Sequence, residues 1–194
     1  MYFIIKMSQA AIIGGAVALM ICCSSSSAAM LMMGGDDSGP AGPTTPIVTK
    51  YRYVRVVRDK DGDDLHPMNL AEVEVFSGGT NVASGKTVTQ SSISHPGTFD
   101  PPNLVDGNKT NFAHTNNEAL EWFQIDLGQE YDIEKVVITN RTDCCQDRLR
   151  NTKIQLSKSA DMSSPKESRT VTTTEAPSAT ITWTPKNGAE LVAA

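Results

Sequence analysis

Short segments that alternate apolar and polar residues recur over residues 50–186, and they constrain the fold more than any other feature. In one of them, Val73 and Val75 fall on one face of the expected strand and Glu72 and Glu74 on the other. Glycines separate the segments, and no long stretch repeats apolar residues at the helical period. The pattern predicts an all-β sandwich or barrel. The expected strands are Tyr51–Val57, Ala71–Phe76, Glu121–Leu127, Lys135–Thr139, Thr152–Leu156 and Ala179–Trp183.

The first part of the chain contains a long apolar segment. No charged residue lies between Met7 and Gly35, and the apolar part, Ala10–Met33, exceeds the roughly 20 residues that cross a bilayer as a helix. We therefore expect residues 1–33 to form an N-terminal apolar helix that anchors the protein in a membrane. The alternatives are a plain buried helix and a cleaved signal peptide, for which the small residues at 27–29 would form the cleavage site.

The anchor and the signal peptide both place the rest of the chain outside the cytosol. The first gives a single-pass membrane protein, on a cell or virion surface, and the second gives a secreted protein. Residues 34–49 are rich in Gly, Pro and Thr, which predicts a linker. The folded domain is then expected over residues 50–186, followed by a tail at 187–194.

Charge and motif content exclude several classes of function. The formal net charge is -5, and the basic cluster at 141–153 is interrupted by Asp143 and Asp147, so the chain lacks the basic surface of a nucleic-acid binder. No carboxylate pair, nucleophile motif or catalytic metal set indicates an enzyme. The cysteine pairs at 22–23 and 144–145 and the three scattered histidines lack zinc-site spacing.

Three passages resemble one known family. They are residues 103–108 (NLVDGN), 122–128 (WFQIDLG) and 137–148 (VITNRTDCCQDR). Together they are similar to the discoidin-like, galactose-binding-like jelly rolls, and within these to the F-type lectins. That family is marked by a histidine, 26 residues, Arg-x-Asp, four residues and a basic residue, which His114, Arg141, Asp143 and Arg148 match. The resemblance predicts a jelly-roll β-sandwich.

The order of the segments differs from the usual F-type lectin. The segments at 52–55 and 71–75 come first here, whereas their counterparts close the usual domain. The domain is therefore interpreted as circularly permuted, which is feasible because the two ends of a domain often lie close together at its surface.

The resemblance also implies a carbohydrate site. His114, Arg141 and Arg148 would bind sugar oxygens, because arginine presents forked donors and histidine gives or accepts a single hydrogen bond. Asp143 would orient an arginine, and Cys144 and Cys145 would form a disulfide that packs against the sugar. Phe99 or Phe112 could form a pocket for a sugar methyl group. Trp122 and Phe123 are expected to be packing residues.

A structural calcium ion (Ca2+) is implied in the same way. Carboxylates and tight-turn carbonyls are the hard oxygen ligands that calcium prefers. The alternative is a turn at 106–108 without a metal. A cysteine pair that staples this loop in some relatives is replaced here by Phe112 and Ala71. The implied ligands are Glu72, Asn103, Asp106, Asn108 and Asn111.

The sequence therefore predicts calcium-dependent binding of fucose-type glycans at a membrane or outer surface, without catalysis. The alternative is a discoidin-like adhesion or structural module that binds protein or lipid, and a homo-oligomer is compatible with both. Asn108 and Asn140 each begin a glycosylation sequon, and we expect Asn140 to remain unmodified.

Overall fold

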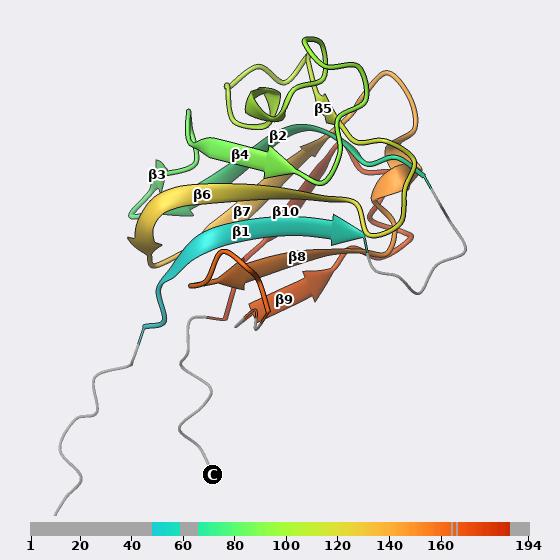
Figure 1. Cartoon of the computed structure of the whole chain (residues 1–194). Helices are drawn as coiled ribbons and strands as arrows, with labels where there is room; N and C mark the ends of the chain where they lie inside the picture. Colours follow the sequence, from blue (N-terminus) through green and yellow to red (C-terminus); the bar gives the residue numbers. More distant parts are fainter. Residues whose placement is uncertain (1–47, 59–65, 164, 166, 187–194) are drawn as a thin grey trace, which may run out of the picture. The chain divides into compact units, whose positions relative to one another are not determined.

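The domain is a sandwich of two antiparallel sheets in a computed structural model, which describes residues 48–58, 66–163, 165 and 167–186. One sheet has the strand order β4-β6-β1-β8-β9. The other has the order β10-β7-β2-β3, and β5 also pairs with β2 (Figure 1). The predicted all-β, galactose-binding-like sandwich is confirmed.

The strands are β1 (Tyr51–Arg58), β2 (Asn69–Ser77), β3 (Thr80–Asn81), β4 (Thr87–Gln90), β5 (Ala113–His114), β6 (Trp122–Tyr131), β7 (Lys135–Asn140), β8 (Thr152–Ser157), β9 (Glu167–Thr170) and β10 (Thr180–Trp183). Two short 3-10 helices, η1 (Pro101–Leu104) and η2 (Gln146–Leu149), complete the elements. All six expected strands are present. The sequence pattern did not indicate β3, β4, β5 or β9, which have two to four residues each.

Strand β2 shows how the alternation produces the core. Val73 and Val75 are fully buried between the sheets, whereas Glu74 points outward and is half-buried. The register against β7 shifts between Leu70 and Glu72, which marks a bulge at Ala71. Because the bulge adds one residue, Leu70 still faces the core although it lies an odd number of positions from Val73.

The two aromatic residues at the start of β6 have different surroundings. Phe123 is buried in the core, as expected. Trp122 was also expected to be a packing residue, but it lies on the outer face of the sheet, where the Arg55 guanidinium lies 4.6 Å from its ring centroid. The alternation along β6 explains the difference, because neighbouring side chains point to opposite faces.

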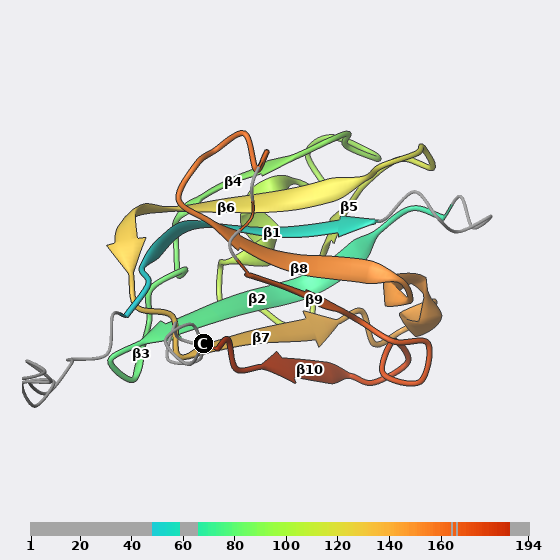
Figure 2. The same ribbon diagram turned by 90° about the horizontal axis from the view of Figure 1, so that it is seen from below.

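The first two strands of the chain lie inside the sheets. Figure 2 shows β1 between β6 and β8, and β2 lies between β7 and the short strands β3 and β5. The two ends of the domain meet at one carboxylate: the Tyr51 hydroxyl donates to Glu167 at 2.8 Å, and the Lys186 amide donates to it at 2.7 Å. This proximity is what a permuted chain order requires.

The predicted apolar helix at 1–33, most of the linker at 34–49 and the whole tail at 187–194 lie outside the described residues. Within the described ranges, no helix has the length and apolar character needed to cross a membrane.

The core predicts a specific stability effect. Leu156 in β8 is fully buried, so Leu156→Ala should lower the free energy of unfolding by about 2–5 kcal/mol, through lost burial and the cavity left behind. Leu120 is 48 % exposed, so Leu120→Ala should change the free energy of unfolding by less than about 0.5 kcal/mol. Urea denaturation of both variants tests this, and equal effects would contradict the described core.

Candidate functional site

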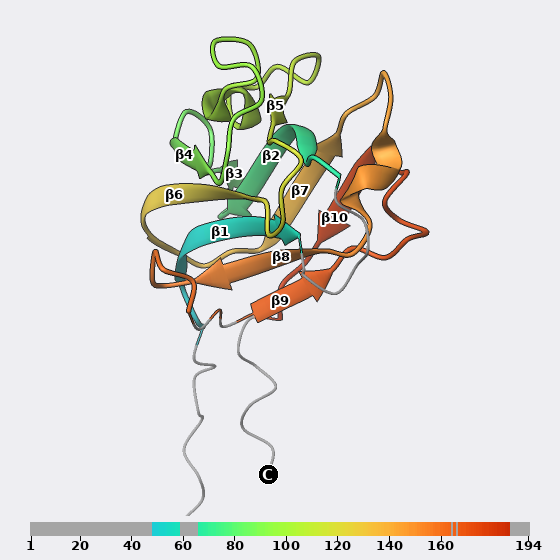
Figure 3. The same cartoon turned by 45° about the vertical axis from the view of Figure 1, so that its right-hand side comes forward.

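Two consecutive segments and a strand that lies far from them in the sequence come together at one end of the sandwich. These are β5 with His114, the loop after β7 with Arg141, and η2 with Arg148 (Figures 1 and 3). The predicted sugar-binding residues therefore come from one region of the surface.

The hydrogen bonding of His114 fixes its tautomer. Its Nδ1 lies 2.6 Å from the carbonyl oxygen of Thr115, and because a carbonyl can only accept, Nδ1 carries the proton. Burial lowers the pKa of His114, and the positive charges of Arg148 and Arg141 lower it further. The neutral ring therefore presents Nε2 as a hydrogen-bond acceptor.

Arg141 is held in place from two sides. Its Nε and Nη2 donate to the two carboxylate oxygens of Asp143 at 2.5 and 2.8 Å. Its guanidinium carbon lies 4.0 Å from the centroid of the Phe112 ring. The Arg141 guanidinium lowers the pKa of Asp143 to about 2, so the pair stays ionised over the whole physiological range. This is the orienting position that the sequence analysis expected for Asp143.

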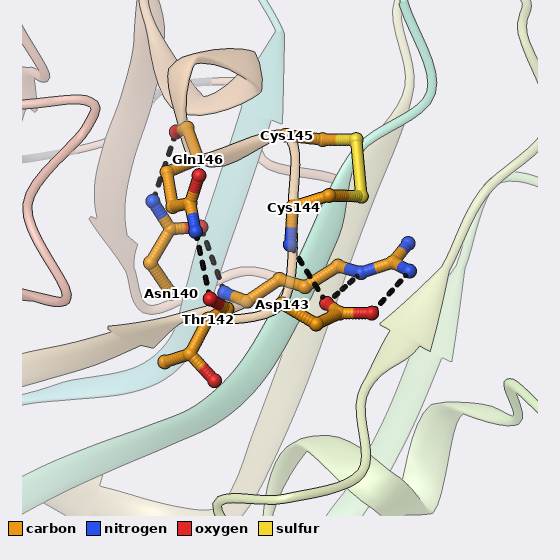
Figure 4. A network of polar contacts seen from close by, with 7 residues as sticks. Asn140, Thr142, Asp143, Cys144, Cys145 and Gln146 are labelled. Atoms are coloured by element: carbon orange, nitrogen blue, oxygen red, sulfur yellow. Dashed lines mark hydrogen bonds and ion pairs between the residues drawn. A yellow bond between two sulfur atoms is a disulfide. The ribbon is translucent and has the colours of Figure 1, made fainter.

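Cys144 and Cys145 form a disulfide between neighbouring residues. Their Cα atoms lie 3.8 Å apart, the separation across a trans peptide bond. Figure 4 shows the sulfur pair projecting from the loop beside Asp143, whose carboxylate accepts a hydrogen bond from the Cys144 amide at 3.0 Å. Cys145 has a positive φ of 64°, and η2 begins directly after it.

Arg148 is the third predicted sugar contact. Its backbone carbonyl accepts a hydrogen bond from Nη2 of Arg58 at 2.8 Å, which ties η2 to the end of β1. Arg148 and Cys145 also line a hollow of about 220 Å³ together with His66 and Asp147. The disulfide and Arg148 therefore border the same open space.

Asn140 anchors the loop that carries these residues, and sequence reasoning missed this role. Its Nδ2 donates to the Gln146 carbonyl at 2.9 Å (Figure 4) and to the Ala176 carbonyl at 2.7 Å, and its Oδ1 accepts from the Arg141 amide at 2.9 Å. The side chain is fully buried. Modification of its nitrogen would break these bonds, so the sequon at Asn140 lies in a position unsuited to a glycan.

An aromatic cluster lies beside His114. The rings of Phe99 and Phe112 stack with their centroids 4.6 Å apart, and the Phe99 ring lies 5.5 Å from the His114 ring. Both candidates for an apolar pocket thus belong to one cluster, which His95 extends by an edge contact with Phe99 at 5.7 Å.

The predicted calcium ligands lie on a loop that precedes β5 and on β2. Glu72 is buried, and both of its carboxylate oxygens accept a hydrogen bond from the Gly107 amide at 3.2 Å. Burial raises the pKa of Glu72 to about 7. Asp106 accepts a hydrogen bond from Nδ2 of Asn111 at 2.7 Å. The side-chain oxygen of Asn108 accepts hydrogen bonds from the backbone amide and the hydroxyl of Thr110.

The donor set of this loop fits a hard cation in part. Glu72 is a buried carboxylate, and Oδ1 of Asn111 is buried without a hydrogen-bond partner. Both are oxygens that calcium would accept as ligands. The side chain of Asn103 instead holds the loop, since its amide donates to the carbonyls of Thr98 and Phe112 at 3.0 and 3.1 Å.

The described part of the chain contains no group of three or more His, Cys, Asp or Glu side chains placed to hold a metal. The calcium set has only two members of these types, Glu72 and Asp106, and would rely on amide and backbone oxygens for the rest.

Comparisons with known proteins agree with the fold. The family described as "NedA-like, galactose-binding domain" matches residues 103–191. Fucolectin-6 of Anguilla japonica is 38% identical over 69 residues, which cover 32% of this chain and 37% of that protein. Fucolectin of Anguilla anguilla is 36% identical over 85 residues, which cover 39% of this chain and 54% of that protein.

The chain thus spans about half or less of the curated relatives it matches. A pentraxin fusion protein of Xenopus laevis is 35% identical over 47 residues, covering 24% of this chain and 11% of that protein. No solved structure matches the chain significantly.

The anchoring role of Asn140 predicts a loss of stability on substitution. Asn140→Ala leaves the buried carbonyls near it without donors, and each should cost about 1–3 kcal/mol. Thr142→Ala is the control, because Thr142 is exposed and its replacement removes the same sequon. Urea denaturation should show a large effect for the first variant and a negligible one for the second; the opposite ranking would reject the anchoring role.

The sandwich topology and these sequence matches together support a galactose-binding-like domain that is similar to the F-type lectins.

Proposed function

We propose that this domain binds carbohydrate of the fucose type and catalyses no reaction. The observation that carries the proposal is the proximity of Arg141 and Arg148 to His114, with the Phe112 ring between Arg141 and His114. The two guanidinium groups supply hydrogen-bond donors, and Nε2 of His114 supplies an acceptor for a hydroxyl. The names of the eel relatives, which are fucolectins, support fucose as the first sugar to test.

The apolar surfaces of the site suit the rest of such a sugar. The stacked rings of Phe99 and Phe112 offer an apolar wall beside His114 for a methyl group. The disulfide of Cys144 and Cys145 offers a second apolar surface for the C–H face of the ring. Polar edges and apolar faces are both needed because a sugar carries both kinds of surface.

The carboxylate nearest to the guanidinium groups argues for binding rather than hydrolysis. Both oxygens of Asp143 are engaged by Arg141, and its pKa of about 2 leaves it without a proton to donate. Glycoside hydrolysis normally requires one carboxylic acid that does donate a proton.

Calcium is proposed as a structural ion of the loop before β5. Glu72 and Asp106 would supply charge, and Asn111 Oδ1 with oxygens of Asn103 and Asn108 would supply neutral ligands. When bound, the ion would neutralise a buried carboxylate and fix the chain that leads to His114. The raised pKa of Glu72 and the unpartnered Asn111 oxygen support this assignment.

We further propose that the domain is presented outside the cytosol, behind the apolar segment Ala10–Met33 as an anchor, or released if that segment is cleaved. A single shallow sugar site binds weakly, so clustering on a surface, or self-association, would raise the avidity for glycans that carry several copies of the sugar.

The first test concerns the sugar contacts. Titration with methyl α-L-fucoside in excess calcium should show that His114→Ala and Arg141→Ala each weaken binding by about tenfold or more, as expected for the loss of one or two hydrogen bonds. Arg52→Ala is the matched control, because Arg52 pairs with Asp126 away from the site and an exposed pair contributes little. Unchanged affinity in the His114 and Arg141 variants would reject the site and favour a protein- or lipid-binding module.

The tautomer of His114 predicts a pH dependence of binding. Its pKa lies below the ordinary value of 6.5, so the affinity should be constant from about pH 8 to 6.5 and fall at more acidic pH, when Nε2 gains a proton and can no longer accept. With calcium in excess, His114→Gln should bind more weakly but lose this acid dependence. An acid loss that persists in His114→Gln would assign it to another group.

The calcium proposal is tested by stability, independently of sugar. At 100 times its dissociation constant, calcium should stabilise the fold by about 2.7 kcal/mol and raise the melting temperature. Glu72→Gln should remove this response, whereas Glu74→Gln, which alters the neighbouring outward carboxylate paired with Lys109, should keep it. An unchanged response to calcium in Glu72→Gln would exclude Glu72 as a ligand.

A further inference from the structure

Asn69, the first residue of β2, has a side chain whose polar atoms lack partners. The residue is fully buried, and neither Oδ1 nor Nδ2 makes a hydrogen bond. A buried polar atom without a partner typically costs about 1–3 kcal/mol, so two of them in one amide call for a function or a bound molecule.

The strand register places this amide directly beside His114. Asn69 and His114 are opposite each other in the β2–β5 pair. The His114 amide donates to the Phe99 carbonyl, and its carbonyl accepts from the Ser94 amide, so the backbone of His114 turns its polar groups away from β2. Such non-hydrogen-bonded pairs bring the two Cβ atoms to about 4.5–5.5 Å on the same face of a sheet.

That face is the one that carries the proposed site. The next pair along, Leu70 and Ala113, is fully buried in the core, so Asn69 and His114 point to the opposite, outer side. On the other flank of β2, Leu70 is opposite Asn140, the residue that precedes Arg141. Asn69 therefore lies below the gap between the histidine and the start of the arginine-bearing loop.

The hydrogen-bonding capacity of the site leaves a role for an amide there. Arginine side chains only donate, and both oxygens of Asp143 are already engaged by Arg141. His114 supplies a single acceptor at Nε2. A sugar with neighbouring hydroxyls brings at least two O–H donors, and an amide can accept from one hydroxyl and donate to the same or the next one.

We propose that Asn69 is a further binding residue of the carbohydrate site, whose amide engages a sugar hydroxyl directly or through one ordered water beneath His114. This inference rests on the proposed carbohydrate binding. It explains why a strand position otherwise suited to an apolar or β-branched residue holds an unpartnered amide. The buried atoms become satisfied only in the liganded or hydrated site.

The experiment compares the unaltered protein with Asn69→Leu, which keeps the size of the side chain and removes its polar atoms. Methyl α-L-fucoside and its 2-, 3- and 4-deoxy analogues are titrated against both. We expect the variant to be as stable as the unaltered protein or more so, and to bind the fucoside about tenfold more weakly, the effect of one hydrogen bond. One deoxy analogue should bind both proteins equally, which identifies the hydroxyl that Asn69 contacts.

Two controls keep the result specific. Asn116→Leu makes the same change at an exposed position of the His114 loop and should leave the affinity unchanged. Asn69→Ala gives a second test if Asn69→Leu folds poorly. In the unaltered protein, the ¹⁵N-labelled side-chain amide of Asn69 should shift during the sugar titration, which needs no variant.

The outcomes separate this inference from the function on which it rests. If the unaltered protein binds no fucoside, the proposed function fails and Asn69 fails with it. If the unaltered protein binds the fucoside and Asn69→Leu binds it equally well while gaining stability, the amide is a packing defect. In that case only the role of Asn69 is overturned. A loss of affinity that is the same for every deoxy analogue also overturns it, because it would reflect a general distortion of the site.

Discussion

Strand β2 pairs with β5 on one side and with β7 on the other, and the candidate site depends on this double pairing. It brings His114 and the start of the Arg141 loop to the same end of one sheet. The bulge at Ala71 then reverses the alternation, so that Leu70 faces the core and Asn69 faces the site. If the strand ran through Ala71 without the bulge, Leu70 would point to the outer face and Asn69 into the core.

Arg141 of the candidate site and the loop that carries it are held in place by contacts within the domain. Arg141 is fixed by Asp143 and by the Phe112 ring, and the loop behind it is fixed by the buried amide of Asn140. Long side chains lose conformational entropy when they bind a ligand, and prior ordering moves that loss from binding to folding. The disulfide adds no long-range constraint, because it closes a ring between adjacent residues, so its contribution is the shape of the surface.

The sequence predicted much of the fold and part of the site. Alternation located six of the ten strands in the described residues, and the spacing from His114 to Arg148 identified the residues that converge. The short strands were missed because their pairing depends on tertiary contacts rather than on local pattern. Asn69 and Asn140 could not be recognised from the sequence either: the first depends on the register with a two-residue strand, and the second on bonds to a segment 36 residues away. The match to residues 103–191 leaves out β1 and β2, the central strands, as a permuted order would produce.

Strand β1 runs from the meeting point of the two domain ends to the site. It begins at Tyr51, bound to Glu167, and ends at Arg58, whose guanidinium reaches the Arg148 carbonyl. Eight residues of strand span about 25 Å. Any attachment made through Val48 or Lys186 therefore joins the sandwich at the end opposite the site (Figure 1). A domain attached through either chain end would therefore keep its candidate site at the far side from the point of attachment.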